Sequence, residues 1–169
     1  MIQKAPRSWE RRLNELLPLY GHRNWIVVAD AAYPAQSKAG IETLVIEAGQ
    51  LESVRIVYDA IQAQKHLRSK IYVDAELKHL TEEDARGVAG YRSVLTELLG
   101  AECTELEHEQ IISKLDHAAE SFRILILKTS LTIPYTSVFF ELDCGYWSAG
   151  AEQRLRSRIA TIKKTGENR

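Results

Sequence analysis

Residues 25–30 read Trp-Ile-Val-Val-Ala-Asp, and they constrain the fold more than any other stretch of the chain. The five apolar residues predict a strand that is covered on both faces, because a strand with one solvent face would alternate apolar and polar residues. Asp30 and then Pro34 end this strand. A sheet with such a strand needs helices on both of its faces.

Alternating helical and strand patterns surround this run. The expected helices span residues 9–20, 51–61, 81–99 and 108–118, and the further expected strands span residues 43–47, 70–74, 103–107, 123–129 and 135–142. Thr81 and Asp84 would cap the third helix. This order predicts an α/β protein, a single three-layer α/β/α sandwich with a largely parallel or mixed central sheet. About five residues join the last two strands, too few for a crossover helix, so one strand pair is expected to be antiparallel.

Composition narrows the possible functions. The 169 residues are 45% hydrophobic and 27% charged, as in a globular domain, and the formal net charge of −1 gives no electrostatic reason to expect nucleic acid or membrane partners. No apolar run reaches the roughly 18–20 residues that span a bilayer, and the polar N-terminus does not resemble a signal peptide. Cys103 and Cys144 are far apart and belong to no paired motif. We therefore expect a soluble, cytoplasmic protein.

The end of the chain differs from the rest. Residues 1–147 are expected to form the α/β domain, and residues 148–169 a basic amphipathic C-terminal helix or tail, in which Leu155, Ile159 and Ile162 recur at helical spacing. Such a helix could touch an acidic partner. Docking on its own domain or on a neighbouring subunit is the favoured interpretation.

His22 follows Gly21 where the first helix ends and the buried strand approaches, so it is expected at the rim of the sheet. With a reference pKa near 6.5, an imidazole both donates and accepts protons near neutral pH. The alternative is structural, in which the ring satisfies carbonyl groups at the end of the helix.

Two further segments carry polar groups at strand ends. Asp30 follows the buried strand, and ligand sites in open α/β sheets gather outside such ends, although an aspartate there also commonly accepts hydrogen bonds from its own turn. Pro134-Tyr135-Thr136-Ser137 offers a phenol and hydroxyl groups that could bind a polyol, or could simply pack in an edge strand.

The sequence predicts no metal and no cofactor. His108 and His117 are nine residues apart, and neither a paired zinc motif nor a glycine-rich phosphate loop is present. A Gly-x-Ser-x-Gly nucleophile motif is also absent.

In this order, the polar segments resemble the D-ribose pyranase/L-fucose mutarotase family, also called the ribose/fucose transport protein family. Gly21-His22, the apolar strand, Asp30-Ala31 and Pro34 resemble one signature, and residues 41–49 the next. His108-Glu109-Gln110 and Pro134-Tyr135-Thr136-Ser137 resemble two more. The resemblance covers roughly residues 8–147. Ser137 stands where the family usually has Asn, and the segment after Glu141 is longer than the usual ending.

The resemblance implies an isomerase that opens and recloses a monosaccharide ring by acid/base catalysis, interconverting anomers or pyranose and furanose forms. It implies His22 as general acid, and Asp30, His108 and Tyr135 as sugar contacts, with Tyr135 assisting His22. Thr136 and Ser137 of the same segment are further expected substrate contacts. A non-catalytic monosaccharide-binding or regulatory protein on the same scaffold is the alternative, which Ser137 favours. An assembly subunit with a partner-recruiting tail is a third interpretation.

Chain geometry bears on where this site lies. If residues 24–30 are extended, their ends are about 20 Å apart, so His22 and Asp30 lie at opposite ends of one strand. One sugar cannot reach both within one subunit. The sequence therefore predicts a homo-oligomer with its site at a subunit interface, and the resemblance implies a closed ring, possibly a decamer.

Overall fold

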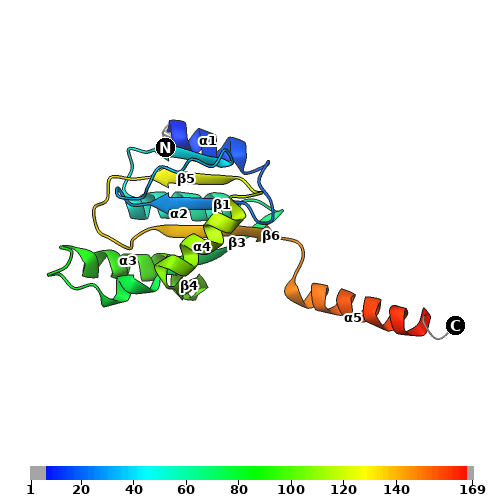
Figure 1. Ribbon diagram of the computed structural model, residues 1–169. Helices are drawn as coiled ribbons and strands as arrows, with labels where there is room; N and C mark the ends of the chain where they lie inside the picture. The colour runs from blue at the N-terminus through cyan, green and yellow to red at the C-terminus, as the bar shows by residue number, and fades with distance from the viewer. Residues whose placement is uncertain (1–6, 167–169) are drawn as a thin grey trace, which may run out of the picture.

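A computed structural model describes the backbone of residues 7–166 and their side chains, apart from those of residue 101 and residues 162–166. Its centre is a six-stranded sheet in the order β2-β5-β1-β6-β3-β4 (Figure 1). The strands are β1 (Trp25–Ala29), β2 (Ile41–Val45), β3 (Leu67–Asp74), β4 (Cys103–Leu106), β5 (Ile124–Lys128) and β6 (Val138–Cys144). The helices are α1 (Ser8–Leu16), α2 (Gln50–Gln62), α3 (Val88–Leu99), α4 (His108–Ala118) and α5 (Ala149–Gly166), with short 3₁₀ turns at Ala75–His79 and Gly100–Glu102.

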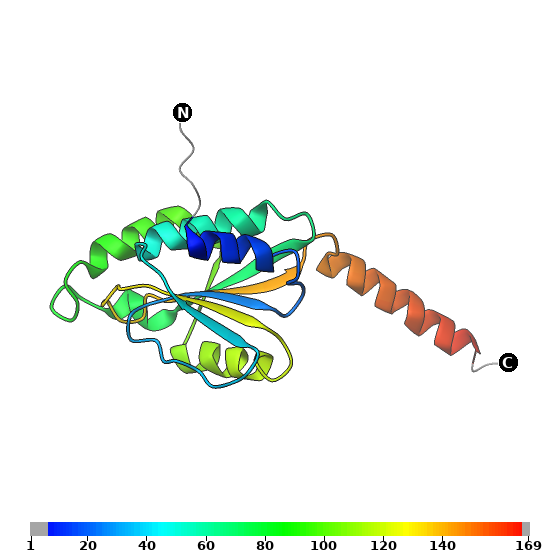
Figure 2. The same cartoon turned by 90° about the horizontal axis from the view of Figure 1, so that it is seen from above.

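Both faces of the sheet are covered, as the apolar run of β1 predicts. Ile26 and Val28 point into a core shared with α1, α2 and α3, whereas Trp25, Val27 and Ala29 point into a second core shared with α4. All five residues are buried. Figure 2 shows the three helices on one side of the sheet and α4 on the other. The predicted α/β/α sandwich is confirmed.

Strand β6 runs antiparallel to both of its neighbours, β1 and β3, while every other strand pair is parallel. The prediction of a mixed sheet is confirmed. The last two strands in sequence are not partners, however, because β1 lies between β5 and β6. Strand β6 therefore lies inside the sheet and not at its edge. It is hydrogen-bonded to β1 on one side and to β3 on the other.

Several expected boundaries are wrong. Helix α1 ends at Leu16 and not at Tyr20, and strand β3 begins at Leu67 and not at Lys70. Helix α3 begins at Val88 and not at Thr81, because the N–H and hydroxyl of Thr81 both donate to Asp84 Oδ2 and close a turn, and Gly87 then adopts the left-handed conformation with φ of 89°. Strand β6 begins at Val138 and not at Tyr135, which also has a positive φ. Strand β2 begins and ends two residues earlier than expected.

The C-terminal helix α5 projects away from the sandwich (Figures 1 and 2). Leu155 is half-buried and Ile159 is exposed, while the Ile162 side chain lies outside the described residues. Docking of α5 on its own domain is therefore not observed in the described part of the chain, and docking on a neighbouring subunit or contact with an acidic partner stays a prediction. No described helix is both long enough and apolar enough to cross a bilayer.

Candidate functional site

Polar side chains at the ends of four strands meet on one side of the sheet, where these strand ends lie next to one another. Asp30 follows β1 and Asp74 ends β3, and these strands run in the same direction on either side of β6. Val28 and Val73 are both in register with Val138 of β6, so Ser137 lies between the two carboxylates. His108 follows the neighbouring β4 and begins α4. This side of the sheet is where ligands bind in open α/β sheets.

Asp30 accepts a hydrogen bond from its own turn and also belongs to the group of polar residues at the strand ends. Its Oδ1 accepts a hydrogen bond from Ala32 N–H at 2.9 Å, which closes its own turn. Its Oδ2 accepts from the Ser137 hydroxyl at 2.9 Å, and Ser137 Oγ accepts from Asp30 N–H at 3.3 Å. Ser137 thus anchors Asp30 and is itself buried.

His108 is paired with a carboxylate that sequence reasoning missed. Its Nδ1 lies 3.0 Å from Oδ1 of Asp74, whose side chain is only 1% exposed. Burial raises the pKa of Asp74 to about 6, and the hydrogen bond with His108 offsets part of that rise. Asp74 Oδ2 is buried and has no hydrogen-bond partner in the described part of the chain. Backbone N–H of His108 donates to Glu76, which holds the start of α4 in place.

Tyr135 faces His108 with the two rings edge to face, their centroids 5.7 Å apart. Its φ of 58° is rare for a residue other than glycine. The loop is fixed from behind, because Gln50 Nε2 and the Tyr91 hydroxyl each donate to the Thr136 carbonyl at 2.8 Å. The Thr136 hydroxyl donates to the Ile133 carbonyl at 2.7 Å, and its side chain is fully buried. Thr136 therefore supports the Tyr135 loop from inside the protein.

A cavity of about 300 Å³ opens between these groups. Its polar lining includes Asp30, Asp74, His108 and Tyr135, and its apolar lining includes Ile112 and Pro134. Tyr33 and Gln36 complete the wall and contact each other through a hydrogen bond of 3.4 Å. A small cavity in which a few polar groups converge on an apolar surface suits a small polar ligand.

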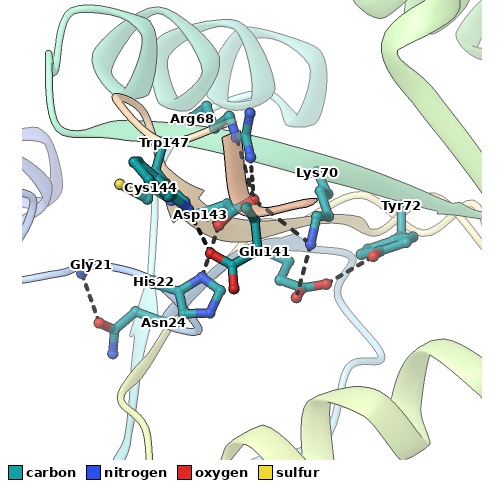
Figure 3. Close-up of polar contacts among 11 residues, drawn as sticks. Gly21, His22, Asn24, Arg68, Lys70, Tyr72, Glu141, Asp143, Cys144 and Trp147 are labelled. Carbon is teal, nitrogen blue, oxygen red and sulfur yellow. Dashed lines mark hydrogen bonds and ion pairs between the residues drawn. The ribbon is translucent and has the colours of Figure 1, made fainter. Parts of the chain in front are cut away.

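His22 lies at the opposite end of β1, before Trp25, and Figure 3 shows it beside Asp143. Its Nδ1 is 2.8 Å from Oδ1 of Asp143 near the end of β6, and its side chain is 53% exposed. Asp30, His108, Tyr135 and Ser137 are brought together, whereas His22 lies beyond the other end of β1. The expected placement of His22 and Asp30 at opposite ends of one strand is confirmed.

Strained backbone conformations are found beside His22 and beside His108. In the described part of the chain, only Arg23 and Tyr135 have positive φ among residues other than glycine, at 75° and 58°. One follows His22 and the other lies against His108. Residues held in sparsely populated conformations concentrate at functional sites, because the rest of the structure must stabilise them.

Asp74 and Asp143 differ in how far the sequence could have identified them. Asp74 ends a strand that the sequence predicts, so the rule that points to Asp30 also points to Asp74. Asp143 reaches His22 only because β6 pairs with β1, and no local pattern indicates that pairing. Among the described residues, no cluster of histidine, cysteine and acidic side chains is arranged to hold a metal ion.

Together, the sandwich and its edge cavity define a small α/β protein with a polar ligand site outside the ends of parallel strands. The model of the RbsD / FucU transport protein family matches residues 4–144, and the chain belongs to that family. The family prediction is thereby confirmed. Helix α5 lies beyond the matched residues.

Solved structures agree with this fold. The chain is 19% identical to Bacillus subtilis RbsD complexed with D-ribose, with a TM-score of 0.55, covering 85% of this chain and 94% of that one. It is also 19% identical to the Streptococcus pneumoniae fucose mutarotase in complex with L-fucose, with a TM-score of 0.55 and coverage of 84% and 98%. FucU from Bifidobacterium longum is 16% identical, with a TM-score of 0.51 and coverage of 79% and 94%. No curated protein matches the chain.

Proposed function

We propose that the protein is a sugar mutarotase that interconverts the anomers, or the pyranose and furanose forms, of a ribose- or fucose-like monosaccharide. The observation that carries this proposal is the cavity in which Asp30, His108 and Tyr135 converge. D-Ribose and L-fucose are bound in two structures of similar fold. A sugar needs several directional polar contacts, and this cavity offers a carboxylate, an imidazole and a phenol.

Ring opening of a hemiacetal requires a proton at the ring oxygen and the loss of a proton from the anomeric hydroxyl. The C–O bond to the ring oxygen breaks and a carbonyl forms, so the step needs no electron donor or acceptor. Reclosure by the same hydroxyl on the other carbonyl face changes the anomer, and reclosure by another hydroxyl changes the ring size. His22 acts as the general acid with Tyr135 assisting proton transfer, and such catalysis contributes about 10²–10⁴-fold.

The other predicted residues hold the sugar. Asp30 accepts hydroxyl hydrogen bonds and His108, fixed by Asp74, contacts the ring. Ser137 acts indirectly, because its hydroxyl holds Asp30 in place. Thr136 also acts indirectly, because its hydroxyl fixes the loop that carries Tyr135.

The separation of His22 from the cavity supports a site shared between subunits. Asp143, the His22 partner, lies near the end of β6, and Ser137, the Asp30 partner, immediately precedes that strand. The six steps between them span about 20 Å when extended. His22 of a neighbouring subunit therefore completes the cavity of this one. An interface of this kind joins unlike surfaces, and it generates a closed ring such as a decamer when the rotation closes.

The second candidate is a non-catalytic sugar-binding protein. It is favoured by Ser137, whose hydroxyl is engaged with Asp30 and is buried, so that it offers no free amide-like donor to a sugar. We also infer a cytoplasmic location, with which the free thiols of Cys103 and Cys144 are compatible.

Saturation-transfer NMR with a panel of aldoses that includes D-ribose and L-fucose tests both candidates. A mutarotase transfers saturation between anomeric signals faster than the uncatalysed rate for at least one sugar. Line broadening on binding without such transfer would support the second candidate. No binding by any sugar of the panel would contradict both.

A further inference from the structure

We infer that Asp143 is the positioning residue of His22, and that it makes Nε2 the nitrogen through which His22 exchanges protons with the sugar. This inference depends on the proposed function, in which His22 is the acid/base group. It concerns a residue for which neither the sequence pattern nor the family resemblance suggests a role.

The two oxygens of Asp143 have separate partners (Figure 3). Oδ1 accepts from Cys144 N–H at 2.8 Å and lies 2.8 Å from His22 Nδ1. Oδ2 accepts from Arg68 Nε at 3.2 Å and Nη2 at 2.8 Å, with Lys70 Nζ at 3.8 Å. Arg68 is directly opposite Asp143 in the β3–β6 register, so the sheet itself aligns this pair. The carboxylate is thus fixed from one side and contacts His22 from the other.

The charge of Asp143 determines the direction of its hydrogen bond to His22. Burial acts to raise the pKa of Asp143, but hydrogen bonds from Arg68, Cys144 and His22, with the nearby charge of Lys70, hold it below its usual value. An ionised carboxylate only accepts hydrogen bonds, so Nδ1 of His22 carries the proton. Neutral His22 then has its lone pair on Nε2, and protonated His22 donates from Nε2.

The Nε2 side of the ring is available to a ligand. Within residues 7–166, no hydrogen bond of His22 other than that of Nδ1 is present, and more than half of its side chain is exposed. Asp143, by contrast, is 12% exposed at its side chain. The pair therefore has a buried anchor and an open end.

The backbone on the other side of the ring is also fixed to β6. Arg23 N–H donates to the Leu142 carbonyl at 2.9 Å, and Leu142 N–H donates to the Asn24 carbonyl at 2.8 Å. Asn24 Oδ1 accepts from Gly21 N–H at 2.8 Å. The strained Arg23 is held by these bonds. Because the ring and its anchor are both attached to the end of one strand, their relative geometry is preorganised, as proton transfer requires.

A purely structural role for Asp143 would be a cross-strand ion pair with Arg68. Glu141 provides the matched control for that alternative. It lies two residues earlier on β6, contacts Lys70 Nζ at 3.8 Å and accepts a hydrogen bond from the Tyr72 hydroxyl at 2.8 Å. Among the described residues, Glu141 has no hydrogen bond or ion pair with His22, and it lies outside the proposed catalytic machinery.

The test measures the imidazole ¹⁵N signals of His22, assigned by their loss in His22→Ala, together with anomer exchange of D-ribose and L-fucose. We expect neutral His22 of the wild-type protein to be the Nδ1–H tautomer. Asp143→Asn should shift this tautomer ratio and slow exchange by at least about tenfold, as when a carboxylate that orients a catalytic histidine is replaced. Glu141→Gln should leave both unchanged.

A wild-type His22 protonated on Nε2 in its neutral form would overturn the inference, even if Asp143→Asn fails to fold. An Asp143→Asn protein with the wild-type tautomer and exchange rate would also overturn it. The proposed function fails by a different result, namely His22→Ala exchanging anomers at the wild-type rate, and the tautomer measurement still decides the role of Asp143 in that case.

Discussion

The two ends of the sheet each hold a histidine against an aspartate, His108 with Asp74 and His22 with Asp143, but in opposite environments. At one end, Asp74 is buried with one oxygen unpartnered, and its pKa is raised to about 6. At the other, Asp143 is surrounded by Arg68, Lys70 and a backbone N–H, and its pKa is lowered. The first pair lines a cavity and the second presents an exposed imidazole. The difference is what the proposed function requires of a sugar-holding half and a proton-transferring half that a single subunit keeps apart.

Removing the exposed imidazole should produce the largest effect. His22→Ala is expected to lower anomer exchange by about 10²–10⁴-fold, the range for loss of a positioned acid/base group. Because the ring is 53% exposed, the midpoint of thermal unfolding should change little. His117→Ala, which removes an exposed histidine of α4, is the control and should retain wild-type exchange. Equal rates in the two variants would remove His22 from the mechanism.

Tyr135→Phe tests the other half of the site and should reduce exchange by about 10²-fold, at the lower end of the same range. The phenol contributes through its hydroxyl, so the ring contact with His108 and the fold should persist. Tyr146→Phe, at an exposed tyrosine outside the cavity, is the matched control. Full exchange by Tyr135→Phe would restrict the role of Tyr135 to packing.

The two carboxylates should give stability a pH dependence of opposite sign. The pKa of Asp74 is raised from 3.8 to about 6, so the folded protein retains a proton that the unfolded chain releases in between. Its contribution to stability is present below about pH 4 and is lost as the pH rises through about 6, by roughly 3 kcal/mol. For Asp143, whose pKa is lowered, the contribution is present above the ordinary carboxyl pKa and is lost as the pH falls.

Urea unfolding between about pH 2 and pH 8 measures this difference. Relative to the wild type, Asp74→Asn should gain stability as the pH rises from about 4 through 6. Asp143→Asn should lose stability relative to the wild type as the pH rises toward about 4, and the loss should stay constant above that. Parallel curves for the wild type and both variants would show that the two environments do not differ as described.

Removing α5 should have the smallest effect on the site. Because α5 projects away from the sandwich, truncation after Gly150 is expected to leave sugar affinity nearly unchanged and to lower the assembly mass or its melting temperature. Light scattering and a melting curve, with sugar titration as the internal control, measure these effects. An unaltered mass and melting curve would mean that α5 covers no subunit surface.

Much of the fold can be predicted from local pattern. The bounds of β1 and α4 agree with the sequence, because a continuous apolar run and a clear helical period are local signals. The position of β6 between β1 and β3 could not be predicted, because strand order depends on pairing between distant segments. The start of α3 was missed because Thr81 and Asp84, a plausible cap, close a separate turn.

In the candidate site too, some residues can be predicted from local pattern, whereas their pairings depend on contacts between distant segments. Asp30, His108 and Tyr135 follow from strand ends and from the family resemblance, and the structure places them around one cavity. Asp74 could have been found by the strand-end rule that points to Asp30, but its pairing with His108, 34 residues away, could not, and neither could that of Asp143 with His22, 121 residues away. Only the folded sheet brings such pairs together.

The central claim is that His22 of one subunit completes the cavity of another. Mixing His22→Ala and Tyr135→Phe proteins after dissociation and reassembly tests it, because an interface can then combine His22 from one chain with Tyr135 from the other. Random reassembly of equal amounts should restore about one quarter of wild-type anomer exchange, since half of the neighbours on each side carry the needed residue. Exchange that stays at the level of the two separate variants, or a wild-type protein that exchanges anomers as a monomer by light scattering, would contradict the account.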